Sequence, residues 1–334
     1  MIKIYCIKND NTKIVDISNI TKNGTTLKKS INEFAWTLDF NITKNSDFYN
    51  IEIGDIIVVK LDDKEIFSGV VINGDITNLS FKAMDYAWYF SKNEDIYQFE
   101  NVEASIVVRK LIETFQAKVG NIEISNTMVD KFYFAKTLGS IIKEIIENIK
   151  SLENQEFRFF YQEEKFHFER SKKNKFLRKQ YNPLGSLKAI LNGYEYNALN
   201  YIKEPKRTLN IEDMRNSIKV YKTSGKEYIQ MSTAKDKANV EKYGLMQKLI
   251  SYKDNDLSKG NTTADNILEQ QNKVKETLNI EIPTLSEFIR DGELLQLEYY
   301  NYAIKGVYEI KSVTYTFTNH KTIFQANMEL ERVK

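Results

Sequence analysis

The chain carries one short pattern twice: Gly54-Asp55-Ile56-Ile57-Val58-Val59 recurs as Gly292-Glu293-Leu294-Leu295-Gln296-Leu297. A second run follows each copy, Ile66-Phe67-Ser68-Gly69-Val70 in the first and Ala303-Ile304-Lys305-Gly306-Val307 in the second. Phe81-Lys82-Ala83 then matches Phe324-Gln325-Ala326, with six extra residues in the second copy. Turns, hairpins and strands in this order predict one β-meander of a small barrel, made twice. Two unrelated hairpins that share common turn chemistry are the alternative.

The sequence around the first copy predicts a nearly all-β unit over residues 1–90. Residues 34–42 alternate apolar and polar side chains, as in a strand with one buried face. Further strands are expected at 56–61, at 67–72 and around Leu79, Phe81 and Ala83. Asp62-Asp63-Lys64 and Asn73-Gly74-Asp75 are predicted as the turns between them, since Asn and Gly accept positive φ at little cost.

The middle of the chain changes character and predicts an α+β segment. Residues 103–117 form a helix pattern whose broad apolar side carries Ile106, Val107, Leu111, Ile112 and Phe115. Residues 138–152 follow the helical period more clearly, with Thr137 placed to cap the helix. The two runs 157–161 and 165–169 are predicted to form a hairpin joined at Gln162-Glu163-Glu164.

The last third predicts a return to strands, which begin near Tyr194, are separated by Pro205 and continue at 218–221 and 228–231. A helix is expected from Thr262, whose spacing to Asp265 resembles a capping box, with an apolar face that runs to Leu278. Tyr308 and Ile310 are out of phase with Val313, Tyr315 and Phe317, which predicts a β-bulge near Lys311-Ser312. A last alternating strand covers residues 324–330.

The expected fold is therefore a β-rich α+β protein with two similar barrel domains and an α+β segment between them. The predicted domains are residues 1–92, residues 93–195 and residues 196–334, the last with a helical insertion around 262–279. Three such chains present six similar units around an axis, so the repeat suits a ring that connects a sixfold object to a threefold one.

Composition excludes several kinds of chemistry. The 334 residues hold 42% hydrophobic side chains, enough for packed cores, and their formal net charge of +2 is too small to attract nucleic acid or an anionic membrane. Two histidines and one cysteine cannot build a His/Cys zinc cluster, a disulfide framework or a Cys-x-x-Cys pair. No run of 18 apolar residues and no secretory signal pattern occur, so we expect no stable membrane insertion and no signal peptide.

After the first copy of the repeat the chain reads Asp85-Tyr86-Ala87-Trp88-Tyr89-Phe90-x-Lys92-Asn93, followed by Tyr97-x-Phe99-x-Asn101 and a helix. This stretch resembles the YqbQ/XkdQ family of tail proteins from contractile phages and phage-derived bacteriocins. Weaker features follow in the family's order: Asp213-Met214-x-Asn216-x-Ile218, Tyr243-Gly244-x-x-Gln247, and Gly292-Glu293 through Leu330. The resemblance covers nearly the whole chain, although Phe34-Ala35-Trp36 stands where similar proteins carry a Trp-centred strand in a more Gly- and Ser-rich setting.

The resemblance implies a structural baseplate hub, similar to the hub of T-even phages. Such a hub is a homotrimer whose barrels form a pseudo-sixfold ring between the hexameric tail tube and the trimeric spike. The implied partners are the tail tube protein, a spike or hub-hydrolase protein, the tape measure protein and other baseplate proteins. The implied place is a virion or an R-type bacteriocin particle (a tailocin), assembled in the bacterial cytoplasm, and the sequence leaves these two kinds of particle open.

Candidate sites for chemistry are few. Glu163-Glu164 could serve a cell-wall hydrolase, but adjacent residues in a hairpin turn point into water, whereas glycosidases need two carboxylates facing each other about 5–9.5 Å apart. Ser224-Gly225-Lys226 lacks the upstream glycine of a phosphate-binding loop and has Glu227 where Ser or Thr is needed. His167 lies between Phe166 and Phe168 and is interpreted as structural, and Cys6 as a small buried apolar residue.

The run from Arg170 to Lys179 holds six cations and no acid, so it is either a contact for an acidic partner or a solvated loop. Aromatic residues for base stacking are not interleaved with these cations, and we expect no sequence-specific binding of nucleic acid. The prediction is a protein that is not an enzyme and has no catalytic, cofactor-binding or metal residues. A tail-tip peptidoglycan hydrolase or a cell-wall-binding module is the alternative.

Overall fold

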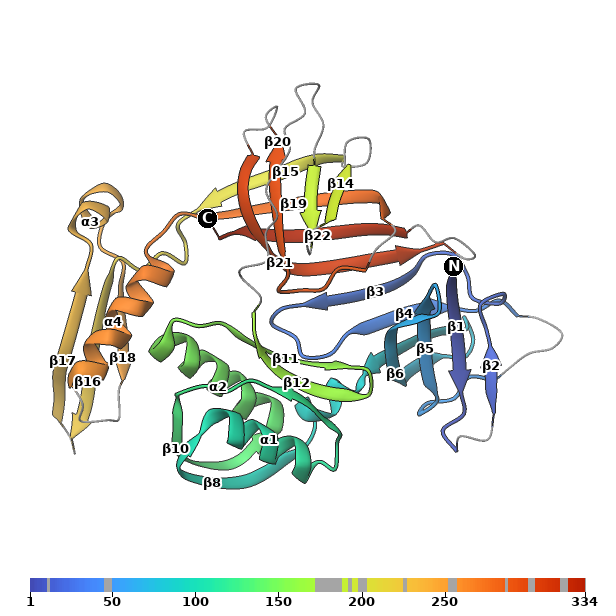
Figure 1. The fold of residues 1–334 in the computed structure, drawn as a ribbon, viewed down its shortest axis with the longest axis horizontal. Coiled ribbons are helices and arrows are strands. Elements are labelled where there is room, and N and C mark those ends of the chain that lie inside the picture. Colours follow the sequence, from blue (N-terminus) through green and yellow to red (C-terminus); the bar gives the residue numbers. More distant parts are fainter. Residues whose placement is uncertain are drawn as a thin grey trace.

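The computed structural model describes residues 1–10, 13–44, 50–171, 188–191, 194–197, 203–224, 227–251, 257–285, 288–299, 304–318 and 324–333. Strands predominate, and a few helices are packed against them (Figure 1). The prediction of a β-rich α+β fold is therefore confirmed. No helix in these ranges is both long and apolar enough to cross a membrane.

The N-terminal half builds seven strands in the order β2-β1-β5-β6-β7-β4-β3. Apolar side chains at alternate positions from 36 to 42 enter the core, so that Trp36, Leu38, Phe40 and Ile42 are all less than 4% exposed, as the alternation predicts. The strands are β1 (Ile2–Ile7), β2 (Ile14–Asp16), β3 (Thr25–Ser30), β4 (Thr37–Asn41), β5 (Ile56–Leu61), β6 (Lys64–Asp75) and β7 (Ser80–Asp85).

The C-terminal half repeats the same pairings in the order β14-β13-β20-β21-β22-β19-β15. The predicted repeat of one meander is present as β5-β6-β7 and β20-β21-β22, and the topology extends it to seven strands in each half. Its members are β13 (Lys188–Leu191), β14 (Tyr194–Asn197), β15 (Lys203–Asn210), β19 (Lys275–Leu285), β20 (Leu294–Tyr299), β21 (Ile304–Phe317) and β22 (Phe324–Arg332).

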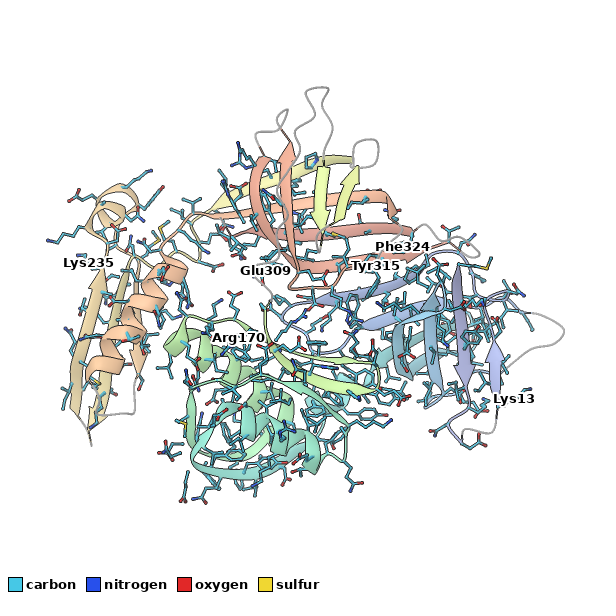
Figure 2. All side chains as sticks on the ribbon, in the orientation of Figure 1. Lys13, Arg170, Lys235, Glu309, Tyr315 and Phe324 are labelled. Carbon is cyan, nitrogen blue, oxygen red and sulfur yellow. The ribbon has the colours of Figure 1, made fainter. Side chains whose placement is uncertain are left out.

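One 14-stranded sheet unites the two halves, because β3 pairs antiparallel with β21. A single apolar core runs through both, in which the rings of Tyr315 and Phe324 meet edge to face at 5.1 Å (Figure 2). The described strands close no barrel. In the first half, the segment after β2 contacts the end of β4 and so partly bridges the gap between the two ends of the sheet. Thr21 forms a β-bridge with Ile42, and the Thr43 N–H donates to the Ile20 carbonyl at 2.7 Å.

The register of the repeat differs from the one that the glycines predict. In the ladders Gly69 lies opposite Ile57, whereas Gly306 lies opposite Leu297, so the two glycines are not equivalent. Gly54 and Gly292 are equivalent, because their N–H groups donate to Val71 and Ile310 at the same point of each meander. The sequence match failed because register is set by the hydrogen bonds of the turn rather than by residue identity.

Asn73-Gly74-Asp75, predicted as a turn, lies inside β6, and the turn follows at residues 76–79. Gly74 serves close approach instead, since a Cβ there would lie 2.9 Å from the Phe81 ring. The turn predicted at Asp62-Asp63 is confirmed, with both residues at positive φ. The bulge predicted near Lys311-Ser312 is also confirmed, as a register shift between Ile310 and Ser312.

The middle segment contains the two predicted helices and the predicted hairpin, together with three strands that the sequence did not predict, and forms a core of its own. Thr137 caps the second helix by accepting the Ser140 N–H at 3.1 Å. Ile106, predicted on the apolar face of the first helix, is 53% exposed, and Val108 is buried instead. The elements are the 3₁₀ helix η1 (Tyr86–Ser91), β8 (Glu94–Glu103), α1 (Ala104–Thr114), β9 (Val119–Ile122), β10 (Met128–Thr137), α2 (Leu138–Glu153), β11 (Phe157–Gln162) and β12 (Lys165–Arg170).

A small unit of three strands and two helices is inserted between β15 and β19, beyond the single helix that the sequence predicts (Figure 1). Its last helix runs from Leu257 to Gln271 rather than from Thr262 to Leu278, and Leu278 belongs to β19. Asn266 and Gln270 on this helix donate to carbonyls at the C-terminal end of α2. The elements are β16 (Ser217–Ser224), β17 (Glu227–Lys235), α3 (Lys237–Tyr243), β18 (Gln247–Ser251) and α4 (Leu257–Gln271).

Pro205 lies within β15, at a register shift between Lys203 and Lys206, rather than between strands. The position suits proline, because among the described strands β15 pairs only with β19 and therefore needs donors on one side alone. The domain borders at 92/93 and 195/196 stay a prediction.

Candidate functional site

A cleft of about 780 Å³ lies between the N-terminal sheet and the middle segment. Strands β1, β2, β5 and β6 line one side, while η1, the end of α1 and the β11–β12 hairpin line the other. Its walls mix apolar and polar side chains, and its charged lining residues are Lys60, Glu65, Lys118 and Glu164. A cleft of this size with a few convergent polar groups is where a small-molecule or saccharide site is looked for first.

The two glutamates of the predicted acidic pair occupy the β11–β12 turn, where both have positive φ. Glu164 forms an ion pair with Lys118 whose partners are each about two thirds exposed, and the hydrogen bond from Lys118 holds the pKa of Glu164 below its usual range. Glu163 does not line the cleft. The pair therefore does not face across a substrate space, in agreement with the expectation for adjacent turn residues.

Glu65, which no sequence pattern indicates, lines the cleft from β6. Burial raises the pKa of this carboxyl, and the negative charges of Glu164 and Glu163 raise it further. Glu65 and Glu164 thus have pKa values displaced in opposite directions within one cleft, as in an acid and base pair. No local sequence signal could have found the pair, because its members come from different parts of the chain.

His167 is held by contacts within the middle segment. Its Nδ1 accepts the Asn121 N–H at 3.1 Å, its Nε2 lies 3.4 Å from the Gln162 carbonyl, and its ring stacks on Phe160. A side chain at Gly120 would collide with the ring, since a Cβ there lies 2.6 Å from it. Both ring nitrogens are engaged, which favours the structural interpretation.

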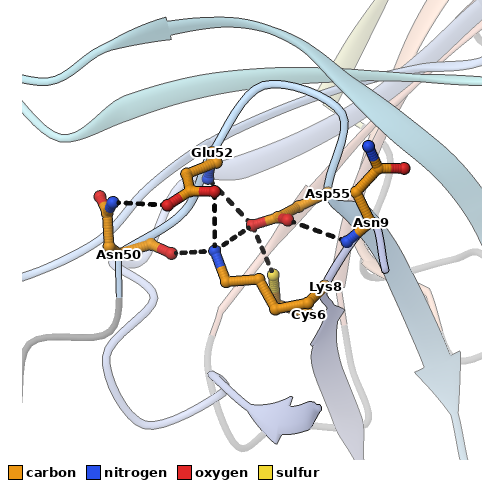
Figure 3. A network of polar contacts seen from close by, with 6 residues as sticks. All are labelled: Cys6, Lys8, Asn9, Asn50, Glu52 and Asp55. Carbon is orange, nitrogen blue, oxygen red and sulfur yellow. Dashed lines mark hydrogen bonds and ion pairs between the residues drawn. The ribbon is translucent and has the colours of Figure 1, made fainter. Parts of the chain in front are cut away.

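Cys6 is a fully buried free cysteine, but it is more than an apolar residue, because it contacts a carboxylate (Figure 3). Its thiol lies 3.7 Å from Oδ2 of Asp55, a carboxylate that is 1% exposed. The same carboxylate accepts from the Lys8 ammonium at 2.9 Å and from the Glu52 and Asn9 N–H groups. Asp55 thereby ties β1 to the glycine-acid turn, which explains the acid in the repeated pattern. Glu293 makes only the local turn contact in the second copy, since it accepts the Arg290 N–H at 3.1 Å as Asp55 accepts the Glu52 N–H.

Asp85, the first residue of the motif that carries the family resemblance, joins three segments. Its carboxylate accepts the Trp36 N–H at 3.0 Å and the Ala87 N–H at 2.9 Å, and it caps η1. Burial raises the pKa of Asp85 to about 7, against the opposing effect of Lys29 and of the two N–H donors. The Trp36 ring packs on Phe288 from the second half of the chain. The motif is thus explained by its place where the two halves of the sheet meet the middle segment.

A buried polar cluster holds the far side of the C-terminal half together. Glu276, at the start of β19, accepts from Arg207 at 2.9 and 3.1 Å, from Arg332 at 3.0 Å and from the Tyr308 hydroxyl at 2.7 Å. Burial alone would raise the pKa of Glu276, but these donors outweigh it and lower the pKa to about 2. The cluster fastens β15, β19, β21 and β22 to one another.

Two sequence candidates lie wholly or partly outside the described residues. Of the turn Ser224-Gly225-Lys226, only Ser224 is described. Of the basic stretch from Arg170 to Lys179, residues 172–179 lie outside the described residues. Arg170, the first cation of that stretch, donates to Gln155 and to the Ile124 carbonyl within the middle segment. In the described ranges no group of three or more His, Cys, Asp or Glu side chains is arranged to hold a metal ion.

Comparison with known proteins gives a family and a fold. A family model described as YQBQ-like matches residues 25–331. The chain is 24% identical to the uncharacterized protein YqbQ of Bacillus subtilis (strain 168), over 64% of this chain and 62% of that protein. It is 28% identical to the phage-like element PBSX protein XkdQ of the same organism, over 36% of this chain and 38% of that protein. The matched stretches span less than two thirds of either relative.

Three solved structures share the fold over nearly their whole length. The tail protein from Neisseria meningitidis MC58 superposes with a TM-score of 0.67 at 11% identity, covering 99% of this chain and 97% of that one. The 43 kDa tail protein of prophage MuSo2 from Shewanella oneidensis gives 0.64 at 10% identity, covering 99% and 98%. Prophage tail protein gp18 from Listeria monocytogenes EGD-e gives 0.63 at 13% identity, covering 98% and 94%.

Proposed function

This chain belongs to the YQBQ-like family, and on that premise we propose that it is a structural protein of a phage or phage-like tail, in which it forms the baseplate hub. In this role three copies form a pseudo-sixfold ring that joins the hexameric tail tube to the trimeric spike. The proposal includes the tail tube, spike, tape measure and other baseplate proteins as partners, and a place in the virion or bacteriocin particle. The family and the fold shared with three tail proteins, two of them from prophages, support a tail role.

The observation that carries the proposal is the repeat of seven strands. β1 pairs with β2 and β5 in the first half, and β13 pairs with β14 and β20 in the second; the remaining pairings correspond in the same way. A chain with two like units can satisfy threefold symmetry by its copies and sixfold symmetry by its units. That arrangement is what a connector between tube and spike requires.

Association in solution and binding to the neighbours test this proposal. Light scattering of the purified chain is expected to give three times the chain mass of 39.1 kDa. Immobilised chain is expected to retain the tube protein and the spike protein from the same particle, and to leave an unrelated tail fibre protein in the flow-through. A chain that stays monomeric at high concentration and retains neither neighbour contradicts the hub role.

One observation favours a second candidate function, hydrolysis of peptidoglycan. The cleft holds Glu65 with a raised pKa and Glu164 with a lowered pKa, as an acid and base pair requires. We propose the structural role as the main one, and an assay on cell walls tests for hydrolase activity directly. Cell walls incubated with the protein should release no muropeptides; release that Glu65→Gln and Glu164→Gln abolish, and that Glu163→Gln leaves unchanged, would establish the hydrolase.

A further inference from the structure

The two halves of the chain meet through one pair of strands. The strand segments that occupy the equivalent positions at the other edge of each half have no strand paired on that side among the described residues. Residues 25–30 of β3 pair antiparallel with residues 312–317 of β21, which extend beyond the end of β20. In the repeat, β15 is the counterpart of β3 and β6 is the counterpart of β21. Among the described strands, β15 pairs only with β19, and residues 73–75 of β6 pair only with β7. Figure 1 shows β15 at one end of the stack of strands that continues through β19, β22 and β21 to β3.

The turn hydrogen bonds fix which residues of β6 and β21 are equivalent. Gly54 donates to the Val71 carbonyl and the Val71 N–H donates to Asp55, each at 2.8 Å. Gly292 donates to the Ile310 carbonyl at 2.8 Å and Ile310 donates to Glu293 at 2.9 Å. A register shift follows directly in both strands, between Val71 and Asn73 and between Ile310 and Ser312. Asn73 therefore corresponds to Ser312, and Ile53 corresponds to Asp291.

The ladders fix the equivalence of β3 and β15. Leu27 lies opposite Leu38, which lies opposite Ala83. Arg207 lies opposite Leu278, which lies opposite Leu330. Ala83 and Leu330 are in turn the partners of Val71 and Ile310. Arg207 thus corresponds to Leu27, and two residues further on Leu209 corresponds to Lys29 and Asn210 to Ser30.

The side chains are complementary both at the β3–β21 junction and between the unpaired edges of β15 and β6. At the junction inside the chain, Lys29 and Asp291 are 3% and 12% exposed and lie 3.6 Å apart as an ion pair. Their counterparts Leu209 and Ile53 are both apolar and are 55% and 59% exposed. Beside Leu209, Oδ1 of Asn210 is shielded from solvent and has no hydrogen-bond partner among the described residues. Exposed apolar residues and a shielded unpaired oxygen along an open strand mark a surface that a partner covers.

We propose that β15 of one copy of the chain pairs antiparallel with residues 73–75 of β6 in the next copy, with Asn210 opposite Asn73. Leu209 then packs on Ile53 of the neighbour, as Lys29 pairs with Asp291 within the chain. The contact is head to tail, so each copy uses both edges and the copies close into a ring. That the ring closes at three copies rests on the proposed function; the strand register does not.

The junction inside the chain has an ion pair where the proposed junction between copies has an apolar pair, and this difference prevents the strands from pairing with the wrong partner. If β3 paired with β6, Lys29 would be buried against Ile53 without a counter-charge, and if β15 paired with β21, Asp291 would be buried against Leu209. Burying an unpaired charge is strongly unfavourable, so each edge rejects the wrong partner. The order of units around the ring follows from this difference.

Disulfide trapping in the full chain tests the register. Ser30 and Ser312 form a pair without mutual backbone hydrogen bonds, because Ile31 donates to Lys311 at the next position; such pairs have Cα atoms about 4.5 Å apart, which a disulfide accepts. Ser30→Cys with Ser312→Cys is therefore the matched control and should give an oxidised monomer. Asn73→Cys with Asn210→Cys should give covalent dimers and trimers on a non-reducing gel, whereas either single variant and the displaced pair Asn73→Cys with Thr208→Cys should give monomer. The native Cys6 is fully buried and stays silent.

A second pair of variants tests the side chains. Leu209→Asp and Ile53→Asp should each weaken association about tenfold or more, while Leu249→Asp, at an equally exposed leucine on β18, should leave it unchanged. Circular dichroism checks that the variants are folded. A wild-type trimer with no cross-link at 73/210 and no response to Leu209→Asp overturns this interface and leaves the proposed function standing. A monomeric wild type overturns both.

Discussion

Replacing Glu276 by glutamine tests how the C-terminal half is held together. The carboxylate is 5% exposed and receives hydrogen bonds from two arginines and from the hydroxyl of Tyr308, whose side chain is fully buried. Glutamine keeps the shape but removes the charge, and its amide group opposes one of the donors. The variant is therefore left with two arginines beside a neutral partner.

The size of the effect follows from the pKa. A fall from 4.5 to about 2 corresponds to about 3 kcal/mol of preference for the charged form in the folded state. Because the side chains of Arg207 and Arg332 are 30% and 40% exposed, water screens part of this, and we expect Glu276→Gln to lose about 2–3 kcal/mol at pH 7. The folded-state pKa lies below the unfolded one, so this stability is present above pH 4.5 and is lost as the pH falls toward 2. At pH 3 the difference between wild type and variant should be about 2 kcal/mol smaller than at pH 7.

Calorimetric unfolding at several pH values measures this difference. Glu329→Gln, at an exposed position of the neighbouring strand β22, is the matched control and should change stability by less than about 0.5 kcal/mol. If Glu276→Gln melts with the control at pH 7, or if its deficit is the same at pH 3 as at pH 7, the cluster does not hold this half of the protein as argued.

Four further substitutions have expected outcomes. The Asp85→Asn variant should gain stability relative to wild type as the pH rises from 4 to 7, by up to about 1.4 kcal/mol per pH unit. The reason is that the folded-state pKa of Asp85, about 7, lies above the unfolded one, so that ionisation destabilises the wild-type fold. A difference in unfolding free energy that does not change with pH contradicts this. Gly69→Ala should destabilise the protein by about 3 kcal/mol or more, since the new Cβ would lie 2.3 Å from the Met84 carbonyl oxygen. Gly260→Ala in helix α4, where the nearest contact of a Cβ is an ordinary 3.8 Å, should stabilise it by about 0.5–1 kcal/mol. Equal melting temperatures of the two variants would refute both expectations. Glu163→Asn should raise the unfolding free energy by up to about 1 kcal/mol, because asparagine tolerates the left-handed φ of 51° better; a loss of stability in urea titration would show that the Glu163 side chain itself contributes.

Local periodicity was a reliable guide wherever one face of an element is buried. The α2 helix and its Thr137 cap, the β11–β12 hairpin and the bulge near Ser312 all follow from patterns within about 15 residues. The repeat was found for the same reason, since its glycine-acid turn is dictated by the positive φ of Gly54 and Gly292 and by the acid that accepts a nearby N–H. The inserted β16–β18 unit was not expected as a unit, because its core is small and its parallel pair β16–β18 leaves no local signature.

Long-range polar contacts could not be predicted from the sequence. Glu65 and Glu164 share a cleft, and Glu276 meets Arg207 and Arg332, only because the sheet brings distant segments together. The equivalence of Leu209 with Lys29 also depends on ladder register, which only the pairings of the folded sheet reveal.

The position of the chain in an assembled particle tests the hub role most directly. Electron microscopy of the particle, reconstructed at the end of the tail tube without imposed symmetry, should show three copies of this chain, with six β units in a ring between tube and spike. Absence of the chain from that ring, or its presence as six copies or along the tube, would contradict the account.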